Sequence, residues 1–251
     1  MSTNSPTGIQ GLDELLNGGI PRGRVVLIVG GPGSGKTTLA SQFLYKGISE
    51  FDENGIFVSL DESKDHFYGE MSSFGWDFAK AENERKFLFV DATKMSRAAM
   101  LRERLNLESQ SIRGKQLQID KLVEKIEAAI DEINAKRVVL DTLATLFYRF
   151  PDPIERRTAI VDLIESLSDL KTTTMITTEL GKITIHRKVT VEEYMSHGVI
   201  MMQTLFSEGV TSRALQVVKM RGTKINPNLV PYTIDKTGIE IFPDVSLFSG
   251  V

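Results

Sequence analysis

The chain has 251 residues, of which 41% are hydrophobic and 25% are charged, and its formal net charge is −3. This balance is typical of a globular α/β domain with a sizeable core, and it excludes wholesale disorder and a broadly basic nucleic-acid-binding surface. The chain has no cysteine, which excludes disulfides and thiolate metal sites, and its three histidines, His66, His186 and His197, are too scattered to indicate a zinc site.

We expect neither a membrane segment nor a secretion signal from this sequence. No apolar run approaches the roughly 20 residues that a membrane span needs, and the opening stretch MSTNSPTGIQG lacks the basic and then apolar pattern of a signal peptide. We therefore expect a cytoplasmic protein that folds as one domain over residues 1–251.

Strand and helix patterns alternate through the first three quarters of the chain. A short helical stripe at Leu12, Leu15 and Leu16 is ended by Gly18 and Gly19. Apolar runs typical of buried strands follow at Val25–Val29, Ile56–Leu60, Phe87–Val90, Val138–Leu140 and Met175–Thr177. Helical patterns lie between these runs at Lys36–Ile48, Lys64–Phe74, Lys115–Ile133 and Ile154–Leu170, with Pro153 in a first helical turn. This alternation predicts parallel strands joined by helical crossovers.

The texture changes from Val199 onward. Short strands separated by turn residues are expected at Val199–Thr204, Ala214–Met220, Val230–Ile234 and Ile239–Phe242. The sequence therefore predicts a central, mostly parallel, twisted sheet flanked by helices, with C-terminal antiparallel hairpins on one edge. The polar stretch Asp91–Gly114 is expected to be a surface excursion with some helix.

The stretch VVLIVGGPGSGKTTLASQFL runs from a buried strand through bare backbone into a helix. Gly30, Gly35, Lys36 and Thr37 fit the spacing GxxxxGK[ST], which binds nucleotide phosphates when a strand precedes it and a helix follows. Glycines let backbone N–H groups converge on phosphate oxygens, and the start of the helix adds a positive dipole end. The residues expected to cradle the phosphates are Gly31, Pro32, Gly33, Ser34, Gly35, Lys36, Thr37 and Thr38. The alternative is a glycine-rich turn with an exposed lysine.

A phosphate loop of this kind needs a partner acid at the end of another buried strand. Asp141 directly follows Val138–Leu140 in the stretch KRVVLDTLATLF. We expect Asp141 and the hydroxyl of Thr37 to hold Mg²⁺, while Lys36 reaches the β- and γ-phosphates of ATP. The alternative is an aspartate that caps the following turn.

Hydrolysis also needs a group that orients water. Asp61 and Glu62 follow the second predicted strand, and the carboxyl ends of parallel strands line the ligand crevice. The alternative is that these acids and Ser63 only cap the next helix. Glu179 follows the last predicted parallel strand, and Thr177 and Thr178 beside it are candidate sensors of the γ-phosphate or members of a simple loop.

These segments resemble the RecA-type ATPases, and within them the KaiC-like family that includes a circadian clock ATPase. The resemblance covers most of the chain. It is carried by the entry segment and phosphate loop, by VSLDES, RVVLDTLATLF and VEEYMSHGVIMM, and by the closing stretch LQVVKMRGTKINPNLVPYTIDKTGIEIFP. The stretch KMRGT followed by PYTIDKTGIEIFP discriminates best, because a phosphate loop alone indicates only nucleotide binding.

The resemblance implies a homo-oligomer, a hexameric ring with ATP at the subunit interfaces. Lys219 and Arg221 would then reach the γ-phosphate of the neighbouring subunit's nucleotide, and their alternate spacing on a strand points both to one side. The adjacent Gly222 would allow a close approach. The alternative is a pair of solvated cations on an edge strand.

Two departures from the family pattern limit what the resemblance implies. Asp61 stands where clock relatives carry glutamate, so we expect Glu62 to orient the water and Asp61 to support it. The clock protein contains two fused copies of this domain and the present chain has one, which makes timekeeping and autophosphorylation doubtful.

Three functions stay open at this stage. The first is a Mg²⁺-dependent ATPase that acts as a regulatory switch for unknown protein partners. The second is a recombinase or recombination mediator acting on single-stranded DNA, for which Arg187, Lys188 and the KMRGTK stretch could line a channel. The third is a nucleotide-binding signalling module that does not hydrolyse ATP.

Overall fold

The computed structural model describes residues 3–93, 112–147, 150, 152–179, 189–207 and 210–245. Its strands are β1 (Asn4–Ser5), β2 (Ile20–Pro21), β3 (Val25–Gly30), β4 (Gly55–Ser59), β5 (Phe87–Asp91), β6 (Arg137–Asp141), β7 (Thr173–Glu179), β8 (Gly198–Ser207), β9 (Val210–Met220), β10 (Val230–Asp235) and β11 (Gly238–Ile241). Its helices are α1 (Leu12–Leu15), α2 (Lys36–Glu50), α3 (Lys64–Ser72), α4 (Phe78–Asn83), α6 (Ile112–Ile133), α7 (Leu143–Phe147), α8 (Pro153–Asp169) and α9 (Val191–Met195).

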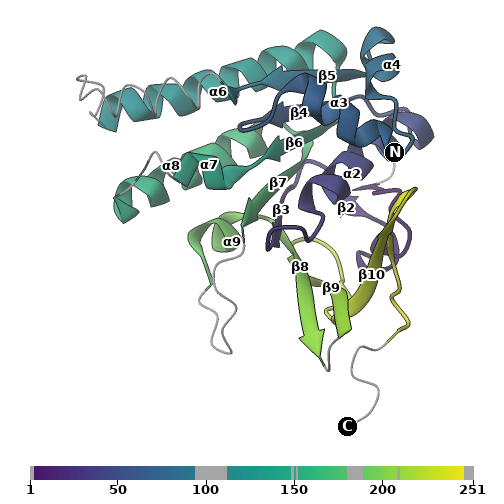
Figure 1. Ribbon diagram of the computed structural model, residues 1–251. Helices are drawn as coiled ribbons and strands as arrows, with labels where there is room; N and C mark the ends of the chain where they lie inside the picture. Colours follow the sequence, from purple (N-terminus) through teal and green to yellow (C-terminus); the bar gives the residue numbers. More distant parts are fainter. Residues whose placement is uncertain are drawn as a thin grey trace.

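One large sheet organises the fold (Figure 1). Within the described residues it has nine strands in the order β11-β10-β9-β8-β3-β7-β6-β4-β5. The strands from β5 to β8 in this order are parallel, and β8, β9, β10 and β11 pair with one another in antiparallel fashion. Because the carboxyl ends of the parallel strands meet at one edge of the sheet, the loops that follow them are brought together there.

Each face of the sheet is covered by its own hydrophobic core. On one face, side chains of α1, α2, α3 and α4 pack against alternate residues of the central strands and against β10 and β11. On the other face the buried residues come from α6, α7 and α8. In Figure 1 these three helices lie together on one side of the sheet, and the far ends of β8 and β9 extend away from them. None of the helices in the described part of the chain combines the length and apolarity that crossing a bilayer requires.

The predicted architecture is confirmed. The strand expected at Val199–Thr204 is β8. It pairs in parallel with β3 on one side and in antiparallel fashion with β9 on the other. The C-terminal hairpins therefore begin with β8, as predicted, and β8 also joins them to the parallel part of the sheet. The predicted proline start of a helix is also confirmed, since Pro153 opens α8 and the Asp152 side chain accepts hydrogen bonds from two first-turn N–H groups. Most of the polar excursion expected at Asp91–Gly114 lies outside the described residues.

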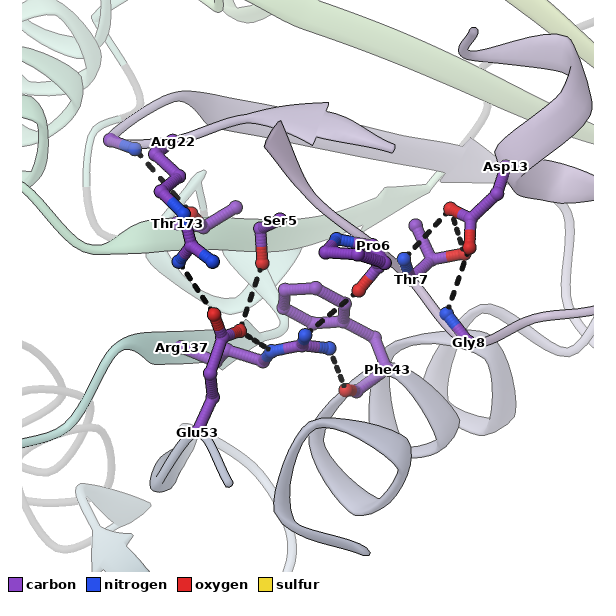
Figure 2. Close-up of polar contacts among 11 residues, drawn as sticks. Ser5, Pro6, Thr7, Gly8, Asp13, Arg22, Phe43, Glu53, Arg137 and Thr173 are labelled. Atoms are coloured by element: carbon purple, nitrogen blue, oxygen red, sulfur yellow. Dashed lines mark hydrogen bonds and ion pairs between the residues drawn. The ribbon is translucent and has the colours of Figure 1, made fainter. Parts of the chain in front are cut away.

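A buried ion pair fastens the N-terminal segment to the sheet (Figure 2). Arg137 on β6 is 0% exposed, and its Nε lies 2.6 Å from Oε2 of Glu53. Its two other nitrogens donate to the backbone oxygens of Phe43 and Pro6, each at 2.8 Å. Arg22 forms a second ion pair with Glu53 at 2.5 Å. Each of the three guanidinium nitrogens thus has a hydrogen-bond acceptor, and these bonds connect β6 to α2 and to the N-terminal segment.

Candidate functional site

The loop between β3 and α2 has the open backbone that its glycines predict. Gly33 and Gly35 have φ values of 73° and 89°, in the left-handed region that favours glycine. At Gly33, nothing lies within 4 Å of the position that a Cβ would occupy. Gly35 is the N-cap of α2 and provides no side-chain cap, so the first N–H groups of this helix are left for another acceptor. The loop therefore offers a cradle of donors to an anion.

Side chains hold this loop in place from two sides. The hydroxyl of Tyr232 on β10 donates to the backbone oxygen of Ser34 at 2.6 Å, and the Ser34 hydroxyl donates to the oxygen of Gly31 at 2.8 Å. Lys36 folds back over the loop, where its Nζ donates to the oxygens of Gly30 and Gly31 at 3.0 and 3.1 Å. Burial lowers the pKa of Lys36, while nearby carboxylates oppose this shift. The ammonium is thus half-buried above the cradle and is not an exposed surface lysine.

Asp141 ends β6 beside the start of α2. Its Oδ2 accepts a hydrogen bond of 2.8 Å from the hydroxyl of Thr37, and its Oδ1 accepts one from the hydroxyl of Thr177 on β7. The peptide bond between Asp141 and Thr142 is cis. Burial raises the pKa of Asp141, and the two hydroxyls and the charge of Lys36 act in the opposite direction. The carboxylate that the sequence placed at a strand end therefore faces the hydroxyl of the phosphate loop.

Glu62 lies just beyond β4, close to these groups. Its backbone N–H donates to the hydroxyl of Ser59 at 3.0 Å, which fixes the turn, and its Oε2 lies 3.4 Å from Nδ1 of His66. Burial, together with neighbouring negative charges, raises the pKa of Glu62 to about 7, although the contact with His66 acts in the opposite direction. The pKa of Asp61 is also raised, by burial and by the charge of Asp141. A carboxylate with a pKa near neutrality is suited to accepting a proton.

Helix capping does not account for Glu62. Ser63 is the N-cap of α3, but its side chain makes no capping hydrogen bond. Glu62 instead directs its carboxylate to His66. The interpretation that the acids serve only to start the helix is therefore not supported for Glu62 and stays open for Asp61.

One open cavity of about 550 Å³ brings the predicted residues together. It is lined by Lys36, Thr37, Asp61, Glu62, Ser63, His66, Glu70, Asp141, Thr142 and Glu179. These residues come from α2, α3 and the ends of β4, β6 and β7. Lysine, hydroxyl and carboxylate groups thus converge where the carboxyl ends of the parallel strands meet.

The comparisons with known proteins agree with this geometry. The family model described as "ATPase: KaiC" matches residues 5–246. The chain belongs to the KaiC family of ATPases. Among curated relatives, the circadian clock oscillator protein KaiC of Synechococcus elongatus is 34% identical over 94% of this chain and 44% of its own length. The circadian clock protein KaiC2 of a Synechocystis species is 34% identical over 96% of this chain and 40% of its own length.

A solved structure shows the same fold in a chain of similar length. A KaiC-like protein from the hyperthermophilic archaeon Pyrococcus horikoshii OT3 is similar with a TM-score of 0.79 and 34% sequence identity, covering 96% of this chain and 99% of the other. The present chain spans less than half the length of the curated KaiC relatives. The family likeness therefore concerns one KaiC-type ATPase domain.

The two threonines proposed as γ-phosphate sensors have different surroundings in this KaiC-family domain. Thr177 is fully buried and its hydroxyl is bonded to Asp141, so it orients that carboxylate. Thr178 alternates to the other face of the sheet and does not line the cavity. Thr178 thus lacks the contact with Asp141 that Thr177 makes, and its role as a sensor stays a prediction. Glu179 does line the cavity, as expected from its place at the end of β7.

Lys219 and Arg221 lie at the opposite end of the sheet from the phosphate loop. Lys219 donates to the backbone oxygens of Tyr194 and Ser196 at 3.0 and 2.7 Å, and Arg221 donates to the same Tyr194 oxygen at 3.2 Å. Both cations thus point to one side, as predicted. The N–H of Arg221 donates to the backbone oxygen of His197, and the N–H of His197 donates to the oxygen of Val25 at the start of β3. Gly30, where the phosphate loop begins, is at the other end of that strand. At about 3.3 Å per residue, this separation is roughly 16 Å along the strand.

β10 pairs with β9 at Leu215 and Ala214, whereas Lys219 lies further along β9 opposite Val199, and the exposed Arg221 follows the strand, so the alternative of a solvated cation pair stays open. Burial lowers the pKa of Lys219, and the charge of Arg221 acts in the same direction. The basic residues Arg187 and Lys188, which were considered as a lining for a DNA channel, lie outside the described residues.

Sequence reasoning missed three side chains that this site uses. Tyr232 reaches the phosphate loop from a strand almost 200 positions away in the chain. His66 and Glu70 line the cavity beside Glu62. Their positions, four and eight residues after Glu62, are a helical spacing that could have indicated a shared face. No local pattern in the sequence could have indicated the contact of Tyr232.

Proposed function

We propose that this chain is a Mg²⁺-dependent ATPase, a single RecA-type domain over residues 1–251 that acts as a regulatory switch. The observation that carries the proposal is the convergence of Lys36, Thr37, Asp141 and Glu62 on one cavity at the mouth of the phosphate loop. Substrate is held by the loop: its N–H groups bind the phosphate oxygens of ATP, and the ammonium of Lys36 moves from the loop carbonyls to the β- and γ-phosphates.

The donor set fits Mg²⁺ as the cofactor. A threonine hydroxyl and a carboxylate lie 2.8 Å apart on adjacent elements, and hard oxygen donors are the ligands that Mg²⁺ prefers. Thr37 and Asp141 would hold the ion, directly or through its water shell. When bound, Mg²⁺ supplies charge neutralisation at the phosphates. Thr177 keeps Asp141 turned towards Thr37 through its own hydrogen bond.

Glu62 is the proposed group that orients and deprotonates the attacking water, with Asp61 in support. Above a pKa of about 7 its carboxylate is ionised and accepts the proton of water. Its place at the end of β4 puts it across the cavity from the phosphate loop. Glu179 lines the same cavity at the end of β7.

Lys219 and Arg221 are proposed to complete the site of a neighbouring subunit in a ring of six. Because they lie at the opposite end of the sheet from their own phosphate loop, they can meet a nucleotide only across a subunit interface. Two cations that reach the γ-phosphate in trans would stabilise the charge of the transition state. This arrangement places ATP between subunits, so nucleotide binding would promote assembly.

The test of the site is a calorimetry and phosphate-release series on the purified chain. We expect Lys36→Ala to lose most of the binding of Mg²⁺-ATP, and Glu62→Gln to bind ATP but to hydrolyse it at least a hundredfold more slowly. Binding in the wild type with no phosphate release would instead favour a signalling module without turnover. Unchanged turnover in both variants would show that Lys36 and Glu62 do not have the proposed catalytic roles. A salt-sensitive gel shift with single-stranded DNA, stimulated by ATP, would favour the recombinase hypothesis.

The test of the ring is a mixing experiment. Arg221→Ala keeps the water-orienting Glu62 but lacks the cation that reaches the neighbouring subunit. Glu62→Gln keeps Arg221 but lacks the water-orienting carboxylate. We expect each to be slow alone, and their equimolar mixture to regain phosphate release, since mixed interfaces combine an intact site with an intact cation. Sizing with and without ATP measures assembly. A fully active monomer would exclude the trans role.

A further inference from the structure

Three metal-ligating side chains converge on the cavity wall formed by the start of α3. Nδ1 of His66 lies 3.4 Å from Oε2 of Glu62 and 3.7 Å from Oε1 of Glu70. All three donor atoms lie within 4.8 Å of one another. The residues are spaced four apart along the chain, so the helical repeat brings them to one face.

This spacing is close to that of a metal centre. At bond lengths of roughly 2.0–2.2 Å, two ligand atoms on a tetrahedral Zn²⁺ are about 3.4 Å apart. The side chains of His66 and Glu70 are 69% and 52% exposed, which leaves them free to make the small rotations that equal distances require. A fourth position would face the open cavity, where water is available.

Glu62 also has one carboxylate oxygen without a partner among the described residues. Within the part of the chain that the structure describes, its Oε1 is buried and has no hydrogen-bond partner, although its Oε2 contacts His66. A buried carboxylate oxygen without a donor is costly. A cation between Glu62, His66 and Glu70 would engage the carboxylate and would also neutralise the two converging negative charges.

The ligand types separate this cluster from the Mg²⁺ site proposed at Thr37 and Asp141. Mg²⁺ prefers an all-oxygen octahedron, whereas imidazole with carboxylate suits Zn²⁺ and similar transition metals. An ordinary pair of helical surface contacts explains one His66–carboxylate contact. Here two such contacts meet at one imidazole nitrogen, beside a buried carboxylate oxygen without a partner in the described part of the chain, which is the arrangement that a bound cation would use.

We propose that Glu62, His66 and Glu70 form a second metal site, which binds Zn²⁺ or a similar divalent transition metal. If the proposed function holds, occupation of this site inhibits the ATPase, because the metal engages the carboxylate that orients water. The domain would then respond to transition-metal availability independently of its Mg²⁺ requirement.

The site itself is tested without nucleotide. ZnCl₂ is titrated into the tag-free, full-length chain in a calorimeter, and the absorption spectrum of added Co²⁺ reports the coordination. We expect one site whose affinity falls at least tenfold in His66→Gln and in Glu70→Gln. Asp65→Asn is the matched control, because it removes an equal charge from the exposed side of the same helix and should leave binding unchanged. No binding, or equal binding in all variants, overturns the proposal.

The inhibitory effect is tested by phosphate release at fixed excess Mg²⁺. Zn²⁺ should inhibit the wild type and Asp65→Asn, whereas Glu70→Gln should resist inhibition when the rate of each variant is compared with its own rate without Zn²⁺. Equal inhibition of Glu70→Gln would show that Zn²⁺ acts elsewhere and would overturn the inhibitory role. If the chain binds Zn²⁺ but does not hydrolyse ATP, the metal site is supported and the proposed function is wrong. If the chain hydrolyses ATP but does not bind Zn²⁺, the proposed function is supported and the metal site is wrong.

Discussion

Replacing Glu62 by glutamine should abolish turnover and at the same time stabilise the fold at alkaline pH. The burial that suits this carboxyl to proton transfer raises its pKa from 4.5 to about 7. In the unfolded chain the carboxyl ionises at its ordinary pKa. The folded protein therefore holds an ionised group that its surroundings disfavour, and glutamine removes this cost while keeping the shape of the side chain.

The size of the effect follows from linkage. One pKa unit corresponds to about 1.4 kcal/mol, so a shift from 4.5 to about 7 costs roughly 3 kcal/mol once the group is ionised in both states. Below the unfolded pKa both states are protonated and there is no cost. The cost grows as the pH rises and is complete above the folded pKa. The gain from Glu62→Gln should therefore be about 3 kcal/mol at pH 8 and less than about 1 kcal/mol at pH 5.

Thermal unfolding of the nucleotide-free chain at both pH values measures this difference. For a domain of this size, about 3 kcal/mol corresponds to an increase in Tm of roughly 6–12 °C at pH 8. Asp65→Asn is again the control, since it removes an exposed carboxylate from the neighbouring helix and should shift Tm little at either pH. An equal shift at both pH values, or a lower Tm at pH 8, would refute the reasoning that burial raises the pKa of Glu62.

Three further predictions follow from the same geometry. The rate of phosphate release should rise with pH through about 7 and then level off, because Glu62 acts in its ionised form; a rate that is flat from pH 5 to 8 would contradict this. Arg137→Met should lower the free energy of unfolding by about 3–5 kcal/mol, since the buried Glu53 loses one of its two cationic partners and two backbone oxygens lose their donor, whereas the exposed Lys136→Met should have little effect in the same urea titration. Thr177→Val should raise the Mg²⁺ concentration needed for half-maximal turnover, because Asp141 loses the bond that orients it; an unchanged Mg²⁺ dependence would exclude this role.

The elements of the central sheet could be predicted because their signals are local. A run of apolar residues such as Val25–Val29 reports burial on both faces, and the glycines after it report a backbone that must stay open. Lys36, Thr37 and Asp141 were found because each stands at a fixed offset from a strand end, and parallel strands bring such ends to one edge. The residues of this site could therefore be predicted from short stretches of sequence.

Strand direction and long-range contacts were not available from such patterns. The alternation in β8 reports which side chains are buried, but it is the same for a parallel and an antiparallel neighbour, so its pairing with β3 was missed. Thr178 shows the same limit, because a shift of one residue along β7 sends its side chain to the other face. The approach of Tyr232 to Ser34 depends on packing between distant segments.

The sequence by itself thus determined the fold class, the phosphate loop and the acid at the end of β6, because these depend on backbone freedom and local burial. Only the tertiary structure decided that His66 and Glu70 share the cavity with Glu62, and that Lys219 and Arg221 lie at the far end of the sheet from the loop. Those relations are set by the packing of α3 on the sheet and by the order of the strands. Neither the packing nor the order is contained in any single segment of the chain.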